Sequence, residues 1–107
     1  SGQSISISRD FIPWGMSFKE FSEREISSIG KQLTDYKEIS RKDMRVSDLD
    51  CILTEFQWRS PKGEIHQMTL LVNYPNVVLM LTASCEGKMT EGQKSHLLEI
   101  LSSFQKN

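Results

Sequence analysis

The chain has 107 residues, which is the length of one domain with one modest core and leaves little room for a large enzymatic cleft. Thirteen basic and fourteen acidic side chains give a formal net charge of −1, so charge gives no support for binding nucleic acid or an anionic membrane. The longest apolar stretch, residues 77–81, is far too short to span a membrane. The first residues show no signal-peptide pattern, and two cysteines are too few for a disulfide framework. A reducing cytoplasm fits these features best, although a mature secreted chain would look the same.

The N-terminal third predicts one strand followed by one helix. Residues 4–8 alternate serine with isoleucine, the period of a half-buried strand. A loop broken at Pro13 follows. Ser17 and Glu20 have the spacing of a capping box, so we expect a helix over 18–33. The apolar stripe of this helix is Phe18, Phe21, Ile26, Ile29 and Leu33.

The rest of the chain predicts four consecutive strands and a final helix. The strands are expected near 36–46, 51–58, 65–74 and 77–84, the last of them apolar enough to lie inside the sheet. In the second of these, alternation separates two faces, which are Ile52, Thr54, Phe56 and Trp58 on one side and Cys51, Leu53, Glu55 and Gln57 on the other. Thr90 is the expected cap of a helix over 90–104, whose apolar stripe is Leu97, Ile100, Leu101 and Phe104.

The order of these elements is β-α-β-β-β-β-α. Short connections make the last three strands an antiparallel meander, and each helix must bury its apolar stripe against the sheet. The sequence therefore predicts an α+β fold: a mostly antiparallel β-sheet of about five strands with two helices.

The sequence carries no motif of catalysis, metal binding or phosphate binding. It has no CxxC, HxxxH, GxGxxG or Walker pattern, and His66 and His96 stand alone. A Cys–His nucleophilic pair is conceivable, but Cys51 and Cys85 both lie in or beside apolar strands, where a small buried side chain is the simpler interpretation. We expect two free thiols, no cofactor and no enzymatic activity.

Polar groups on apolar faces are the unusual feature of this sequence. Glu25 lies seven residues after Phe18, inside the helical stripe, where a carboxylate needs a partner or solvent. On the strand over 65–74, Gln67 shares a face with Ile65 and Leu71. Such a face suits an ordinary solvent-facing sheet, with Gln67 an exposed strand residue, or a groove for an apolar helix that carries a few polar groups.

Several short motifs, in their order and spacing, resemble the DcrB-like family and more closely its type VI secretion branch, the effector-associated (Eag) chaperones. The resemblance covers essentially the whole chain, from Ile5 to Phe104. Its motifs are Ser8-Arg9-Asp10, Ile12-Pro13-Trp14-Gly15-Met16-Ser17, Phe21, Glu23-Arg24, Glu55-Phe56-Gln57-Trp58, His66-Gln67 and Leu81-Thr82-Ala83-Ser84.

This resemblance implies a Mog1/PsbP-like fold, a homodimer and no catalysis. Eag chaperones bind the hydrophobic N-terminal helices of PAAR- or Rhs-type effectors in the bacterial cytoplasm. They shield these helices from aggregation and membrane insertion, and they help to load the effector onto the secretion spike. We therefore expect a single DcrB-like chaperone domain over 1–107, without the further N-terminal strand region that family members usually carry.

The physical chemistry of transmembrane helices suggests which residues would bind them. Such helices present small residues and Ser or Thr hydroxyls to one another, so side-chain amides that both donate and accept hydrogen bonds suit the groove. Gln67 fits this role, and Gln57 fits it if it shares the open face. The predicted effector-helix-binding set is completed by Ile5, Ile7, Glu25, Ile29, Leu33 and Ile65. At the position of Glu25 the family often has glutamine.

Two other functions stay open at this point. One is a DcrB-like envelope protein or a Mog1-like structural binding domain with another protein partner. The other is an enzyme, for which the sequence offers the least support. A secretory leader in the parent gene would favour the envelope protein, and a neighbouring effector gene would favour the chaperone.

Overall fold

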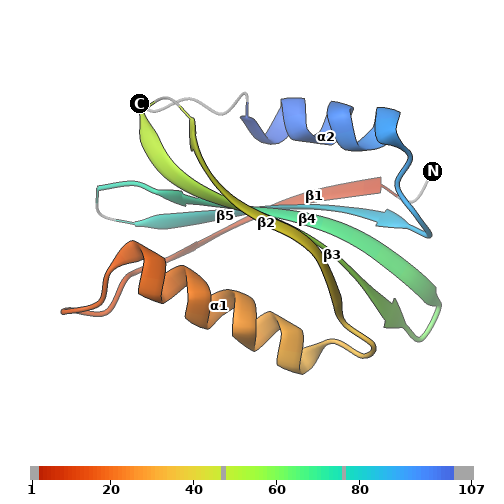
Figure 1. Ribbon diagram of the computed structural model, residues 1–107, viewed down its shortest axis with the longest axis horizontal. Coiled ribbons are helices and arrows are strands. Elements are labelled where there is room, and N and C mark those ends of the chain that lie inside the picture. The colour runs from red at the N-terminus through yellow and green to blue at the C-terminus, as the bar shows by residue number, and fades with distance from the viewer. Residues whose placement is uncertain (1–2, 47, 76, 103–107) are drawn as a thin grey trace.

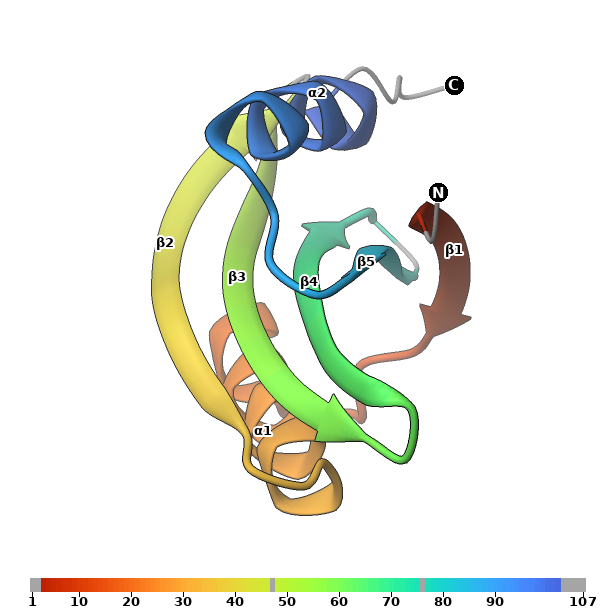
Figure 2. The same cartoon turned by 90° about the vertical axis from the view of Figure 1, so that its right-hand side faces the viewer.

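One five-stranded antiparallel sheet separates two helices, one on each face (Figures 1 and 2). The computed structural model describes residues 3–46, 48–75 and 77–102. The elements are β1 (Gln3–Asp10), α1 (Phe18–Gln32), β2 (Lys37–Val46), β3 (Leu49–Ser60), β4 (Gly63–Asn73), β5 (Val78–Glu86) and α2 (Glu91–Ser102). The spatial order is β1-β5-β4-β3-β2 with every neighbouring pair antiparallel. The predicted α+β fold and element order are confirmed.

Both helices begin at a reciprocal cap. The Ser17 hydroxyl accepts a hydrogen bond from the Glu20 backbone amide at 3.1 Å, and the Glu20 carboxylate accepts one from the Ser17 backbone amide at 2.9 Å. These hydrogen bonds lower the pKa of Glu20. Thr90 and Gln93 repeat the pattern at the start of α2, at 3.1 and 2.8 Å. The capping prediction for both helices is therefore confirmed.

The face covered by α1 has a small apolar core. Phe21 and Ile26 of the helix pack on Ile52, Leu71 and Val78, which come from three neighbouring strands. Of the predicted helical stripe, Phe21 and Ile26 are buried, while Phe18, Ile29 and Leu33 are half-buried. The second half of α1 therefore leaves its apolar side chains at the edge of the core rather than inside it.

The face covered by α2 has the larger core. Its buried members are Val46, Leu49, Cys51, Leu53, Met68, Leu70, Val72, Leu81, Ala83, Cys85, Met89 and Leu97. The prediction that Ile100 belongs to the buried stripe of this helix is wrong, because Leu97 and Leu98 pack against the sheet and Ile100 is left exposed. Phe104 lies outside the described residues. Cys51 and Cys85 are free thiols in this core, and burial raises the pKa of Cys51.

The two edges of the sheet differ in chemistry. β2 carries six charged residues in ten, and its pairing with β3 shifts register between Glu38 and Ser40. Charges and a bulge both discourage pairing with another strand. β1 pairs regularly with β5 and is uncharged up to Arg9, and it leaves Ile5 43% and Ile7 64% exposed. The edge at β1 is therefore the one open to a further strand.

The cap of α1 gives a direct stability test. Ser17→Ala removes the acceptor of the Glu20 amide, and we expect the free energy of unfolding to fall by about 1 kcal/mol. Urea unfolding measures this change. Ser27→Ala, at an exposed position inside the same helix, is the matched control and should be neutral or slightly stabilising. Equal effects of the two variants would contradict a capping role.

Candidate binding groove

A cavity lies between the second half of α1 and the sheet. It has a volume of about 200 Å³ and is lined by Ile29, Gln32, Leu33, Phe56, Gln67, Thr69 and Thr82. The helix supplies a mainly aliphatic wall, while the strands supply a mainly polar floor. Because residues opposite each other in antiparallel strands share a face, the floor continues past β5 to Ser4 and Ser6 of β1, which lie opposite Ser84 and Thr82 and are exposed. We call this surface the α1-face groove.

Gln67 is the centre of the polar floor. Trp58 donates its Nε1–H to Gln67 Oε1 at 2.6 Å, and Gln67 Nε2 donates to the Ser84 hydroxyl at 2.6 Å. One N–H and one acceptor lone pair of the amide remain after these two bonds. The amide is therefore fixed in orientation, and it keeps the capacity to bind a further polar group.

A row of hydroxyls crosses the sheet beside Gln67. Thr54, Thr69, Thr82 and Ser6 lie opposite one another on β3, β4, β5 and β1. Thr69 and Thr82 are 3.4 Å apart, oxygen to oxygen. Among the described residues, the buried hydroxyls of Thr54 and Ser22 have no hydrogen-bond partner. Buried hydroxyls are normally hydrogen-bonded, and packing alone would favour valine or isoleucine at these positions. The row therefore makes the α1 face more polar than packing requires.

The α1-face groove unites three of the predicted binding residues. Ile29, Leu33 and Gln67 line the same cavity. Ile65 lies on the same sheet face, opposite Trp58, and is half-buried. Glu25 is half-buried on α1 but does not line the cavity. Its neighbour Arg24 does not pair with the Glu25 carboxylate; the Arg24 guanidinium lies over the Phe21 ring, 5.4 Å from the ring centroid. The half-buried Glu25 carboxylate is therefore hydrated by solvent rather than enclosed in the core.

Three other predicted residues lie on the opposite face of the sheet. Gln57 is opposite His66, Ile5 is opposite Ala83, and Ile7 is opposite Leu81. All of these partners belong to the α2 face. The expectation of a single groove shared by all eight residues is corrected by this register, since Gln57 and Gln67 lie on opposite sides of the sheet. The set is divided into an α1-face group and an α2-face group.

The expectation that Gln67 is an exposed strand residue is also corrected, because it is half-buried and bonded on both sides. The sequence patterns alone do not identify its partners Trp58 and Ser84 as parts of the floor. The signal for Trp58 was present in the alternation of residues 51–58, which predicts its face. Ser84 requires knowledge that β5 pairs with β4 in this register, which period-two alternation alone does not give.

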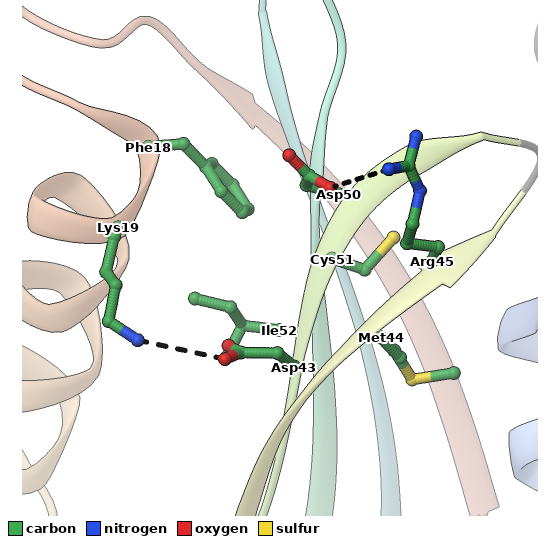
Figure 3. Close-up of a pocket in the computed structure, with 8 residues that line it drawn as sticks. All are labelled: Phe18, Lys19, Asp43, Met44, Arg45, Asp50, Cys51 and Ile52. Atoms are coloured by element: carbon green, nitrogen blue, oxygen red, sulfur yellow. Dashed lines mark ion pairs between the residues drawn. The ribbon is translucent and has the colours of Figure 1, made fainter.

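A larger cavity, of about 390 Å³, lies at the other end of α1 (Figure 3). Phe18 and Ile52 turn their side chains toward the space between the helix and β3. Lys19 pairs with Asp43, and Arg45 pairs with Asp50, each at 3.8 Å. These pairs are exposed and long, so they contribute little stability. Charges of both signs balance at this rim, and we assign no ligand to it.

Two searches of the described residues bear on other kinds of site. Neither α1 nor α2 combines the length and the apolar character that a membrane-spanning helix needs. Over 3–46, 48–75 and 77–102, no three His, Cys, Asp or Glu side chains are grouped so that they could hold a metal ion.

Comparison with known proteins agrees with this architecture. The model of the DcrB family matches residues 1–103. PA94 of Pseudomonas aeruginosa, a protein of unknown function, superimposes with a TM-score of 0.87 and 18% identity, over 98% of this chain and 73% of that one. Cyanobacterial PsbP from Synechocystis sp. PCC 6803 superimposes with a TM-score of 0.77 and 12% identity, over 96% of this chain and 66% of that one. No curated protein gives a significant match. These likenesses confirm the predicted PsbP-like fold.

The unpartnered hydroxyl of Thr54 predicts a variant that is more stable than the natural chain. Thr54→Val keeps the side-chain shape and removes a buried hydroxyl without a partner, so we expect the free energy of unfolding to rise by about 1 kcal/mol. Thr82→Val is the control, because that hydroxyl is half-buried beside Thr69, and it should bring no comparable gain. A loss of stability in Thr54→Val would show that the hydroxyl has a partner.

Proposed function

The chain belongs to the DcrB family, and from this premise we propose that it is a cytoplasmic chaperone or adaptor for the hydrophobic N-terminal helices of type VI secretion effectors. In this proposal the α1-face groove receives one face of such a helix and shields it before the effector is loaded onto the secretion spike. The observation that carries the proposal is the polar floor around Gln67 beside an aliphatic wall.

The floor suits a helix of the transmembrane type better than a plain apolar segment. Transmembrane helices associate through small residues and through Ser and Thr hydroxyls that hydrogen-bond across the interface. Gln67 has one spare donor and one spare acceptor site. A helix that placed a hydroxyl on Gln67 would exchange water for a partner that can both give and take a hydrogen bond.

The wall and the open side of the groove set how a helix would lie. The cavity between α1 and the sheet is large enough for side chains rather than for a whole helix, at about 200 Å³. We infer that anchor side chains enter against Ile29 and Leu33, while the body of the helix lies over β5 and the exposed serines of β1. This is the helix-in-groove mode of recognition.

Titration with a synthetic helix in mild detergent tests the proposal. The peptide carries Ser, Thr and Gly on one face, and a matched peptide replaces them with Ala and Leu. Gln67→Ala and Gln67→Leu should each weaken binding of the first peptide roughly 5- to 150-fold, since a lost bond that leaves its partner unsatisfied costs about 1–3 kcal/mol. Binding of the matched peptide should change little.

The controls separate binding from folding. Gln57→Ala lies on the opposite face of the sheet and should leave affinity unchanged, and Glu25→Gln should keep or improve it. A melting curve for each variant is needed, because Gln67 also bonds Trp58 and Ser84. Unchanged affinity in a folded Gln67→Ala variant would remove Gln67 from the site. Equal effects on both peptides would favour a binding domain for another kind of partner.

We further propose that the protein acts as a homodimer and that its interface includes the edge strand β1, which is uncharged up to Arg9 and open to pairing. Light scattering should give twice the chain mass at high micromolar concentration. Ile7→Lys should shift the population toward monomer, because a charge on an open edge strand opposes pairing. Ile39→Lys on β2, at a site 42% exposed, is the matched control at the other edge. A monomer in the natural chain would contradict the proposal.

A further inference from the structure

A buried polar cluster connects the start of α2 to the sheet. His66 on β4 is 1% exposed and Glu55 on β3 is 8% exposed. His66 Nε2 is 2.7 Å from Glu55 Oε2, and Lys94 Nζ of α2 is 3.0 Å from the same oxygen. The amide of Met89, in the connection from β5 to α2, donates to His66 Nδ1 at 3.1 Å. We call these four groups the α2 clasp.

The hydrogen bonds of the clasp determine the protonation state of the imidazole. Because Nδ1 accepts the Met89 N–H, it carries no proton. Glu55 has only acceptor oxygens when ionised, so the proton between it and the ring belongs to Nε2. His66 is therefore a neutral imidazole with its proton on Nε2, and both ring nitrogens are satisfied.

We propose that the α2 clasp is a proton-operated switch, in which a second proton on His66 detaches the start of α2 from the sheet. A protonated Nδ1 would present one N–H to another, so the Met89 amide would lose its acceptor in a buried place. The imidazolium would also place a second positive charge next to Lys94, because both groups contact the same oxygen of Glu55. The two polar contacts that attach the α2 segment, Met89 to His66 and Lys94 to Glu55, both weaken, while the ring stays hydrogen-bonded to Glu55.

The titratable groups around His66 come from β2, β3, β5, α2 and the loop before α2. Glu55 faces it from β3, and Lys94 with Glu91 comes from α2, where the two form an ion pair at 3.3 Å. Cys85 of β5 lies opposite it in the sheet. An open cavity of about 630 Å³ reaches the ring, and its charged lining residues are Lys37, Glu38, Lys88, Glu91 and Lys94. This opening gives solvent protons a route to the ring.

Glu55 stays ionised above about pH 5. Burial alone would raise the pKa of Glu55, but hydrogen bonds from Lys94 and His66 outweigh it and lower this pKa below its ordinary value of 4.5. The stability that the ionised carboxylate contributes is thus present above about pH 4.5 and is lost only as the pH falls through the lowered pKa. A change in protection above about pH 5 therefore does not report on protonation of Glu55.

Amide hydrogen exchange measured between about pH 8 and pH 5 tests the switch. After correction for the intrinsic pH dependence of exchange, protection of the Met89 amide and of the first turns of α2 should fall roughly 5- to 10-fold on acidification, the equivalent of about one hydrogen bond. Protection in β3 and β4 should stay constant. Unchanged protection at Met89 would overturn the proposal.

Two substitutions test separately the hydrogen bonds made by Nδ1 and by Nε2 of His66. His66→Asn places an acceptor near the Nδ1 position and cannot titrate, so protection at Met89 should no longer depend on pH. His66→Gln places its amide near Nε2 and should give low protection at every pH. His96→Asn, at the exposed second histidine, is the control and should behave as the natural chain does. Retained pH dependence in His66→Asn would overturn the proposal.

A readout on the natural chain covers the case in which these variants fail to fold. Nitrogen-15 shifts of the His66 ring should show a proton on Nε2 alone at neutral pH. On acidification, protonation of Nδ1 should coincide with the shift of the Met89 amide resonance. A proton on Nδ1 at neutral pH, or an amide that does not respond when the ring titrates, would contradict the switch.

Discussion

The register of the β3–β4 hairpin determines which chemistry each face of this protein receives. Both strands are buried on both sides, and Leu70 and Leu71 are neighbours with 0% exposure on opposite faces. The same alternation sends His66 to the α2 face and Gln67 to the α1 face. A slip of one residue would exchange the two and would place every apolar side chain of the strand on the wrong side. The large apolar contacts thus fix the positions of the polar groups.

Local chemistry was enough to predict the elements and the alternation of side chains within a strand. The capping pairs at Ser17 and Thr90 marked the start of both helices. The alternation over 51–58 correctly separated these residues of β3 into two faces. These signals work because a cap or a period of two depends on residues close in sequence. The antiparallel meander of the last three strands followed in the same way, since short turns leave few other connections.

Contacts between distant segments were beyond the sequence. Which face Ile5 and Ile7 occupy depends on how β1 pairs with β5, more than seventy residues later. Gln57 and Gln67 look equivalent in sequence, and the hairpin register alone separates them. The clasp likewise joins Glu55, His66 and Lys94 from three elements. A lone histidine gives no sign of its partners when they are brought to it by tertiary structure.

The polar groups of the two faces differ in how fully they are hydrogen-bonded, and both proposals rest on this difference. In the α2 clasp every ring nitrogen and the Glu55 carboxylate have partners, so the cluster fixes a helix to the sheet. On the α1 face Gln67 keeps spare capacity and Thr54 has no partner. Buried groups left unsatisfied cost stability, and a chain selected for packing alone would replace them. In the proposed complex, a bound helix would use the spare donor and acceptor sites of Gln67, so the proposed recognition surface lies on the α1 face and the proposed switch lies on the other.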